Sequence, residues 1–106
     1  MTEVKVVLVT VPDEESGLAL ARSLVGERLA ACANLVPGLR SIYHWQGRVE
    51  EAKELLLILK TRAELIDDLA RRVAELHPYD LPEVLALEVS GGLPAYLDWV
   101  EAETSA

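Results

Sequence analysis

The chain has a single cysteine, Cys32, and no long apolar run. One cysteine cannot form an intrachain disulfide, and it cannot form a Cys-x-x-Cys metal or redox motif. The longest uninterrupted apolar run, residues 55–59, is far shorter than the roughly 18 residues that a membrane span needs. The first residues enter a strand pattern without the features of a signal peptide. We therefore expect a soluble cytosolic protein whose stability comes from packing.

Basic side chains are scarce, because ten lysines and arginines face eighteen aspartates and glutamates, a formal net charge of −8. Such a surface repels phosphate backbones, so nucleic acid is not an expected partner. The same field attracts cations, although many proteins are acidic for solubility alone. Asn34 and Gln46 are the only side-chain amides. Depletion of heat-labile residues is typical of thermophiles, so we expect a melting midpoint above about 65 °C.

Catalytic motifs are also missing. The two histidines, the one cysteine and the few serines stand in no nucleophile-elbow or triad spacing. No glycine-rich phosphate loop is present, since Gly91 and Gly92 mark only a turn. The sequence therefore predicts a protein that is not an enzyme.

The chain length predicts one domain, residues 1–106. Residues 5–11 form a nearly continuous β-branched run, which favours a central strand covered on both faces. Asp13 is the expected N-cap of a first helix. Its apolar stripe is predicted to comprise Leu18, Ala21, Val25 and Leu29, widened by Leu20 and Leu24.

Two long antiparallel strands are expected next. Residues 33–46 alternate in the way a strand does, with Tyr43 and Trp45 on one face. Pro37 and Gly38 interrupt the pattern and predict a bulge or an edge position. Gly47 marks a hairpin turn into a strand of about residues 50–60.

The second half of the chain predicts a helix, a strand and a final helix. Residues 61–64, Thr-Arg-Ala-Glu, resemble a capping box. Helical spacing continues to Leu76, and Pro78 ends the helix. Ion pairs are predicted between Asp67 and Arg71 and between Asp68 and Arg72, because in each pair the acidic residue precedes the basic one by four positions. Residues 83–90 alternate as a fourth strand, and Pro94 opens the last helix.

The predicted order is that of an α+β, ferredoxin-like split βαβ fold, βαββαβ plus a C-terminal helix. It has one antiparallel sheet with both main helices on a single face, so the other face is bare. The long hairpin also exposes strand edges, with Tyr43 and Trp45 among its side chains. Such a surface usually meets another chain, which predicts an oligomer.

Few residues could hold a metal ion. His77 ends the second helix, where the dipole favours a charged imidazole; it could cap the last helical carbonyls or bind metal. Cys32 could be a small core residue or a ligand. Three or four ligands are needed. Any site must therefore cross a subunit boundary or add carboxylates such as Glu54 or Glu83. The aromatic residues Tyr43, Trp45 and Tyr79 could line an interface, a core or a ligand cage.

Several separated motifs resemble one known family. They occupy residues 30–34 (Ala-Ala-Cys-Ala-Asn), 41–47 (Ser-x-Tyr-x-Trp-x-Gly), 59–61 (Leu-Lys-Thr), 77–83 (His-Pro-Tyr-x-x-Pro-Glu) and 96–99 (Tyr-Leu-x-Trp). In this order they look like the signature of the CutA family of divalent-cation tolerance proteins. The resemblance implies a ferredoxin-like subunit in a tight homotrimer, similar in architecture to the PII signalling proteins. Cytoplasmic bacterial members are linked to tolerance of copper and other heavy metals.

The resemblance also implies a cleft between neighbouring subunits, around Cys32, Tyr43, Trp45, Glu54, Lys60, His77, Tyr79 and Glu83. Some copper-binding relatives have a cysteine and a second histidine where this chain has Val9 and Leu76. Because this chain lacks these two donors, the resemblance implies that His77, with Cys32 or a carboxylate, binds a divalent metal weakly. Copper is the metal we expect. Two alternatives stay open: a PII-like signalling or adaptor trimer that uses Lys60 and the aromatic cleft, and a purely structural scaffold.

Overall fold

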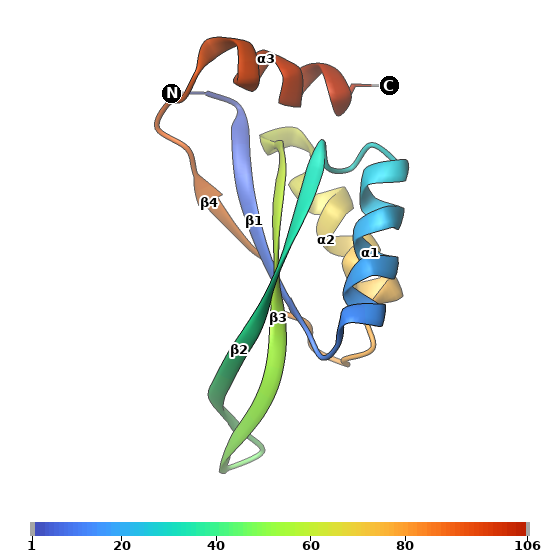
Figure 1. Ribbon diagram of the computed structural model, residues 1–106, viewed down its shortest axis with the longest axis vertical. Coiled ribbons are helices and arrows are strands. Elements are labelled where there is room, and N and C mark those ends of the chain that lie inside the picture. Colours follow the sequence, from blue (N-terminus) through green and yellow to red (C-terminus); the bar gives the residue numbers. More distant parts are fainter. Residues whose placement is uncertain (1, 106) are drawn as a thin grey trace.

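A computed structural model describes residues 2–105 of the chain. The elements are β1 (Val4–Val11), α1 (Glu14–Gly26), β2 (Cys32–Trp45), β3 (Arg48–Arg62), the 3-10 turn η1 (Ala63–Leu65), α2 (Ile66–Leu76), β4 (Leu85–Glu88) and α3 (Pro94–Glu103). The strands form one sheet in the order β2-β3-β1-β4 with antiparallel neighbours. Helices α1 and α2 lie on one side of it, and α3 crosses one end (Figure 1). The predicted ferredoxin-like arrangement is confirmed.

The core lies between the sheet and helices α1 and α2. Strand β1 is an inner strand, as its β-branched run predicted, and Val7, Val9 and Val11 are fully buried. The helices cover them with Leu20, Ala21 and Leu24 of α1 and Leu69 and Val73 of α2. The predicted stripe of α1 was wrong at Val25, which is 38% exposed. The helix is rotated so that its Leu20–Leu24 edge, rather than Leu18 and Val25, faces the sheet. No helix within residues 2–105 is long and apolar enough to cross a membrane.

The β2–β3 hairpin is long and projects beyond the helices (Figure 1). Its register shifts between Val36 and Leu39, which confirms the predicted bulge at Pro37 and Gly38. Gln46 and Gly47 have φ angles of 50° and 78°. Two successive left-handed residues make the tight turn that matches the twist of the paired strands.

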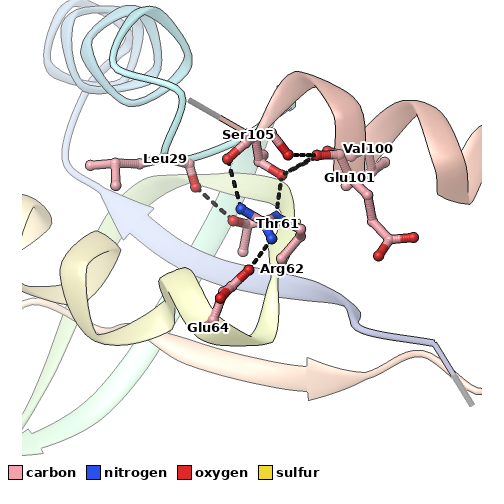
Figure 2. Close-up of polar contacts among 8 residues, drawn as sticks. Leu29, Thr61, Arg62, Glu64, Val100, Glu101 and Ser105 are labelled. Atoms are coloured by element: carbon pink, nitrogen blue, oxygen red, sulfur yellow. Dashed lines mark hydrogen bonds and ion pairs between the residues drawn. The ribbon is translucent and has the colours of Figure 1, made fainter.

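The predicted capping box is wrong. Thr61 and Arg62 still belong to β3, where they pair with Lys5 and Val4 of β1. The Thr61 hydroxyl donates a hydrogen bond of 2.7 Å to the Leu29 carbonyl instead of capping a helix (Figure 2). The η1 turn that follows has no side-chain cap. Pairing with β1 prolongs the strand past the point where local signals predicted a helix.

The predicted ion pairs of α2 are also wrong. Arg71 bonds Asp68, one turn back, at 2.8 Å. Arg72 reaches α1 instead and donates to both oxygens of the Glu27 carboxylate at 2.9 Å. That hydrogen bonding lowers the pKa of Glu27. Arg72 therefore ties α2 to α1.

The sheet has a second face that α1 and α2 do not cover, here called the open face. Strand alternation places it opposite the buried valines of β1. Its apolar residues include Val6, Leu8, Val36, Leu56, Ile58, Leu85 and Leu87. Three of them are largely exposed: Val36, Leu85 and Leu87. At one end α3 packs against Val4 through Val100. Strand β4, at the sheet edge, is shorter than predicted.

Candidate functional site

The structure divides the predicted site residues into two groups on the open face. Cys32 and Lys60 are cross-strand partners near α3. Tyr43, Trp45, Glu54, Tyr79 and Glu83 line one cleft at the other end. Lys60 and Glu54 are six positions apart on β3, about 20 Å along a strand. One subunit therefore does not bring all the predicted residues together.

The cleft lies between the hairpin and the loop that follows α2. Its volume is about 680 Å³. The lining residues are Thr10, Ser41, Ile42, Tyr43, Trp45, Glu54, Pro78, Tyr79, Asp80, Leu81 and Glu83. Strand register places Ser41, Tyr43 and Trp45 on the same face of the hairpin as Glu54. The cleft thus combines aromatic rings with carboxylates.

Glu54 and Tyr79 are joined inside this cleft. Glu54 is only 8% exposed. Its Oε2 accepts a hydrogen bond of 2.8 Å from the Tyr79 hydroxyl. Burial, together with the hydrogen bond and charge of Glu54, raises the pKa of Tyr79 well above its usual range. Tyr79 therefore stays a neutral hydroxyl that donates to the Glu54 side chain.

Tyr79 should make stability depend on pH in alkaline solution. Its pKa is raised in the folded state, so its contribution is complete below about pH 10 and is lost as the pH rises further. We expect Tyr79→Phe to flatten the alkaline decline in the free energy of unfolding, measured by urea titration at several pH values. Glu54→Gln should let the Tyr79 phenolate form at lower pH, seen by ultraviolet absorbance. Identical alkaline slopes for the wild type and Tyr79→Phe would contradict this assignment.

His77 lies behind the cleft and is 8% exposed. Its Nε2 is 2.7 Å from the Thr10 carbonyl, and the Tyr79 backbone N–H donates to Nδ1 at 3.0 Å. A carbonyl only accepts and an N–H only donates, so the ring donates from Nε2 and accepts at Nδ1. His77 does cap α2, as one interpretation predicted, but through its backbone N–H, which donates to the Val73 carbonyl at 2.8 Å, and not through its ring. Its ring ties the loop after α2 to β1, and a metal would have to displace one of these bonds.

Cys32 is half-buried at the other end of the open face, rather than in the core. Its Sγ lies 3.6 Å from the Tyr96 hydroxyl of α3. This contact raises the pKa of Tyr96. The Lys60 ammonium donates to the Asn34 side chain beside it. Within residues 2–105, no three histidine, cysteine or acidic side chains are grouped in a way that could hold a metal ion.

Some residues of these two groups were not singled out as candidates. Tyr96 and Asn34 stand inside the motifs that carried the family resemblance, so a signal for them existed. Thr10 and Asp80 reach the cleft only because β1 and the loop after α2 meet there. No local pattern marks such a meeting point.

Comparison with known proteins agrees with this architecture. Residues 5–103 match the sequence profile of the family described as CutA1 divalent ion tolerance protein. The divalent-cation tolerance protein CutA of Thermus thermophilus is 53% identical over 100 residues, 94% of this chain and 97% of that protein. The chloroplastic CutA of Arabidopsis thaliana is 50% identical over 93% of this chain, which spans only 54% of that longer protein.

A solved structure supports the same assignment. The crystal structure of CutA from Xylella fastidiosa matches with a TM-score of 0.95 and 43% sequence identity, over 98% of this chain and all of that one. Both the sequence profile and this fold cover nearly the whole chain. The chain therefore belongs to the CutA1 divalent ion tolerance family.

Proposed function

We propose that this protein is a non-enzymatic homotrimer that binds a divalent metal where its subunits meet and so contributes to metal tolerance. Copper is the leading candidate for this metal. The open face carries this proposal. It presents Val36, Leu85 and Leu87 to solvent beside half-buried apolar neighbours. Soluble proteins rarely leave such a continuous apolar sheet surface uncovered. Membership of a divalent ion tolerance family supports the metal.

The metal site we propose includes donors from more than one subunit. A metal ion needs three or four ligands, and thiolate and imidazole are suitable donors for copper. Cys32 is the better placed donor, because its thiol is half-exposed on the open face. His77 would bind only by exchanging its bond to Thr10 or Tyr79 for the metal. This exchange would make binding weak.

Titration calorimetry with copper and zinc tests the metal, and light scattering on a size-exclusion column tests the assembly. We expect a mass three times that of the 11.6-kDa chain. Cys32→Ala and His77→Ala should each weaken copper binding at least about tenfold. His44→Ala is the matched control, because His44 is exposed on the hairpin and does not line the cleft. A monomeric mass, or copper affinity unchanged by both Cys32→Ala and His77→Ala, would contradict the proposal.

The charge of the cleft argues against the alternative of a PII-like trimer with a small anionic ligand there. Glu54, Asp80 and Glu83 line it. Lys60, the cation this alternative relied on, lies near the other end of the sheet and bonds Asn34. An anion would therefore enter a field of the wrong sign.

A further inference from the structure

The cleft at Tyr43, Trp45 and Tyr79 has a chemistry that the metal proposal does not use. Three aromatic rings and the carboxylates of Glu54, Asp80 and Glu83 line it, whereas none of its lining residues within residues 2–105 is basic. Its volume of about 680 Å³ lies within the range of small-molecule sites, about 300 to 1,000 Å³. The net charge of −8 adds to the negative potential at its mouth.

Glu54 is the feature that points to a ligand. Its side chain is more than nine-tenths buried and lines the cleft. Tyr79 donates to Oε2, whereas Oε1 has neither a hydrogen bond nor an ion pair within the described chain and is accessible to solvent. Buried carboxylates are normally paired with a cation. A positive charge that enters the cleft would therefore find an accessible carboxylate oxygen on a side chain that is otherwise buried.

We propose that this cleft binds a small organic ammonium ion, whose charge meets Glu54 and whose carbon chain packs against the aromatic walls. Aromatic faces attract ammonium groups and cover alkyl chains. Aromatic faces are not among the oxygen, nitrogen and sulfur donors that hold metal ions in proteins. The same region lacks a group of three metal-ligating side chains within residues 2–105. An organic cation therefore fits the cleft better than a bare metal ion, and its binding does not depend on Cys32 or His77.

Titration calorimetry with putrescine, a four-carbon diammonium ion, tests this proposal on the wild-type protein. The uncharged 1,4-butanediol has the same carbon chain and should bind at least about tenfold more weakly, because a hydroxyl cannot supply the charge that Glu54 lacks. Trp45→Leu should weaken putrescine binding about two- to fivefold through the lost cation–π contact. Equal affinity for putrescine and 1,4-butanediol, or no binding of either, would overturn the proposal.

Glu54→Gln separates the site from general attraction to an acidic protein. It keeps the side-chain shape and an acceptor for Tyr79, and it should weaken putrescine binding at least about tenfold. Glu51→Gln is the matched control; it removes the same charge from the same strand, but Glu51 is exposed and does not line the cleft. Equal losses in the two variants would overturn the proposal. A third outcome would also overturn the proposal: the wild type does not bind putrescine, and Glu54→Gln dissociates the assembly. In that case a basic side chain of a neighbouring subunit would occupy the cleft.

Discussion

Replacing Val36 and Leu87 together by aspartate should convert the proposed trimer into monomers. Val36 is 38% exposed on β2, and Leu87 is 45% exposed on β4, so the pair spans the open face from one edge strand to the other. A carboxylate in a covered apolar surface loses its hydration without gaining a partner, which costs several kcal/mol per charge. A trimer would repeat this cost three times. Light scattering should therefore show a threefold fall in mass.

Val25→Asp is the control for this experiment. Val25 is also 38% exposed, but it lies in the last turn of α1, on the opposite side of the sheet from the open face. It should keep the mass of the wild type. Circular dichroism of the double variant checks that each subunit remains folded. A folded double variant that keeps the wild-type mass would show that the subunits do not meet through this face.

Replacing Arg62 by methionine should destabilise the protein by about 2–3 kcal/mol and release α3 first. The Arg62 guanidinium donates to the Thr104 hydroxyl at 2.9 Å and to the Thr104 carbonyl at 3.0 Å. Glu64 pairs with the same guanidinium. Thr104 is buried, and hydrogen bonds that involve a charged group contribute about 1.5–3 kcal/mol. These bonds attach the C-terminal end of α3 to β3.

Hydrogen exchange and urea unfolding measure this effect. Amide protection should fall along α3 more than along β1 in the Arg62→Met variant. Arg71→Met provides the control, because Arg71 is largely exposed and, within residues 2–105, pairs only with Asp68 on the same helix. Exposed pairs of that kind contribute less than about 1 kcal/mol. If the two variants lose the same small amount of stability, the contact between Arg62 and Thr104 does not hold α3.

The metal and ammonium proposals involve different ends of the open face. Cys32 lies near α3, and Glu54 lies toward the end of the hairpin. Variants at one end can therefore be tested against the ligand of the other. Copper binding that survives Glu54→Gln, together with putrescine binding that survives Cys32→Ala, would establish two independent sites.

Local patterns in the sequence correctly predicted the features that are set by residues close together along the chain. The β-branched run predicted β1, Pro37 and Gly38 predicted the bulge, and Pro78 predicted the end of α2. The Asp13 N-cap also formed, with its carboxylate accepting from the Ser16 N–H at 2.7 Å. Each of these features is decided within a few residues by backbone sterics, periodicity or capping.

Local predictions of side-chain hydrogen bonds were wrong where the partner lies far along the chain. Thr61 bonds Leu29 rather than capping a helix, and Arg72 bonds Glu27 on another helix. His77 bonds Thr10, which is 67 positions away along the chain. A polar side chain has several local partners that would satisfy it, and only the packed neighbours decide between them.

The sequence by itself determined the order of the elements, the inner position of β1 and the family signature, because periodicity and turn chemistry are local properties. The tertiary structure alone decided which side chains share a site. It placed Cys32 and Glu54 about 20 Å apart along the sheet, and it brought Asp80 to the cleft that Tyr43 also lines. The physical reason is that strand register and the path of a loop are set by the burial of the whole core, which no short segment specifies.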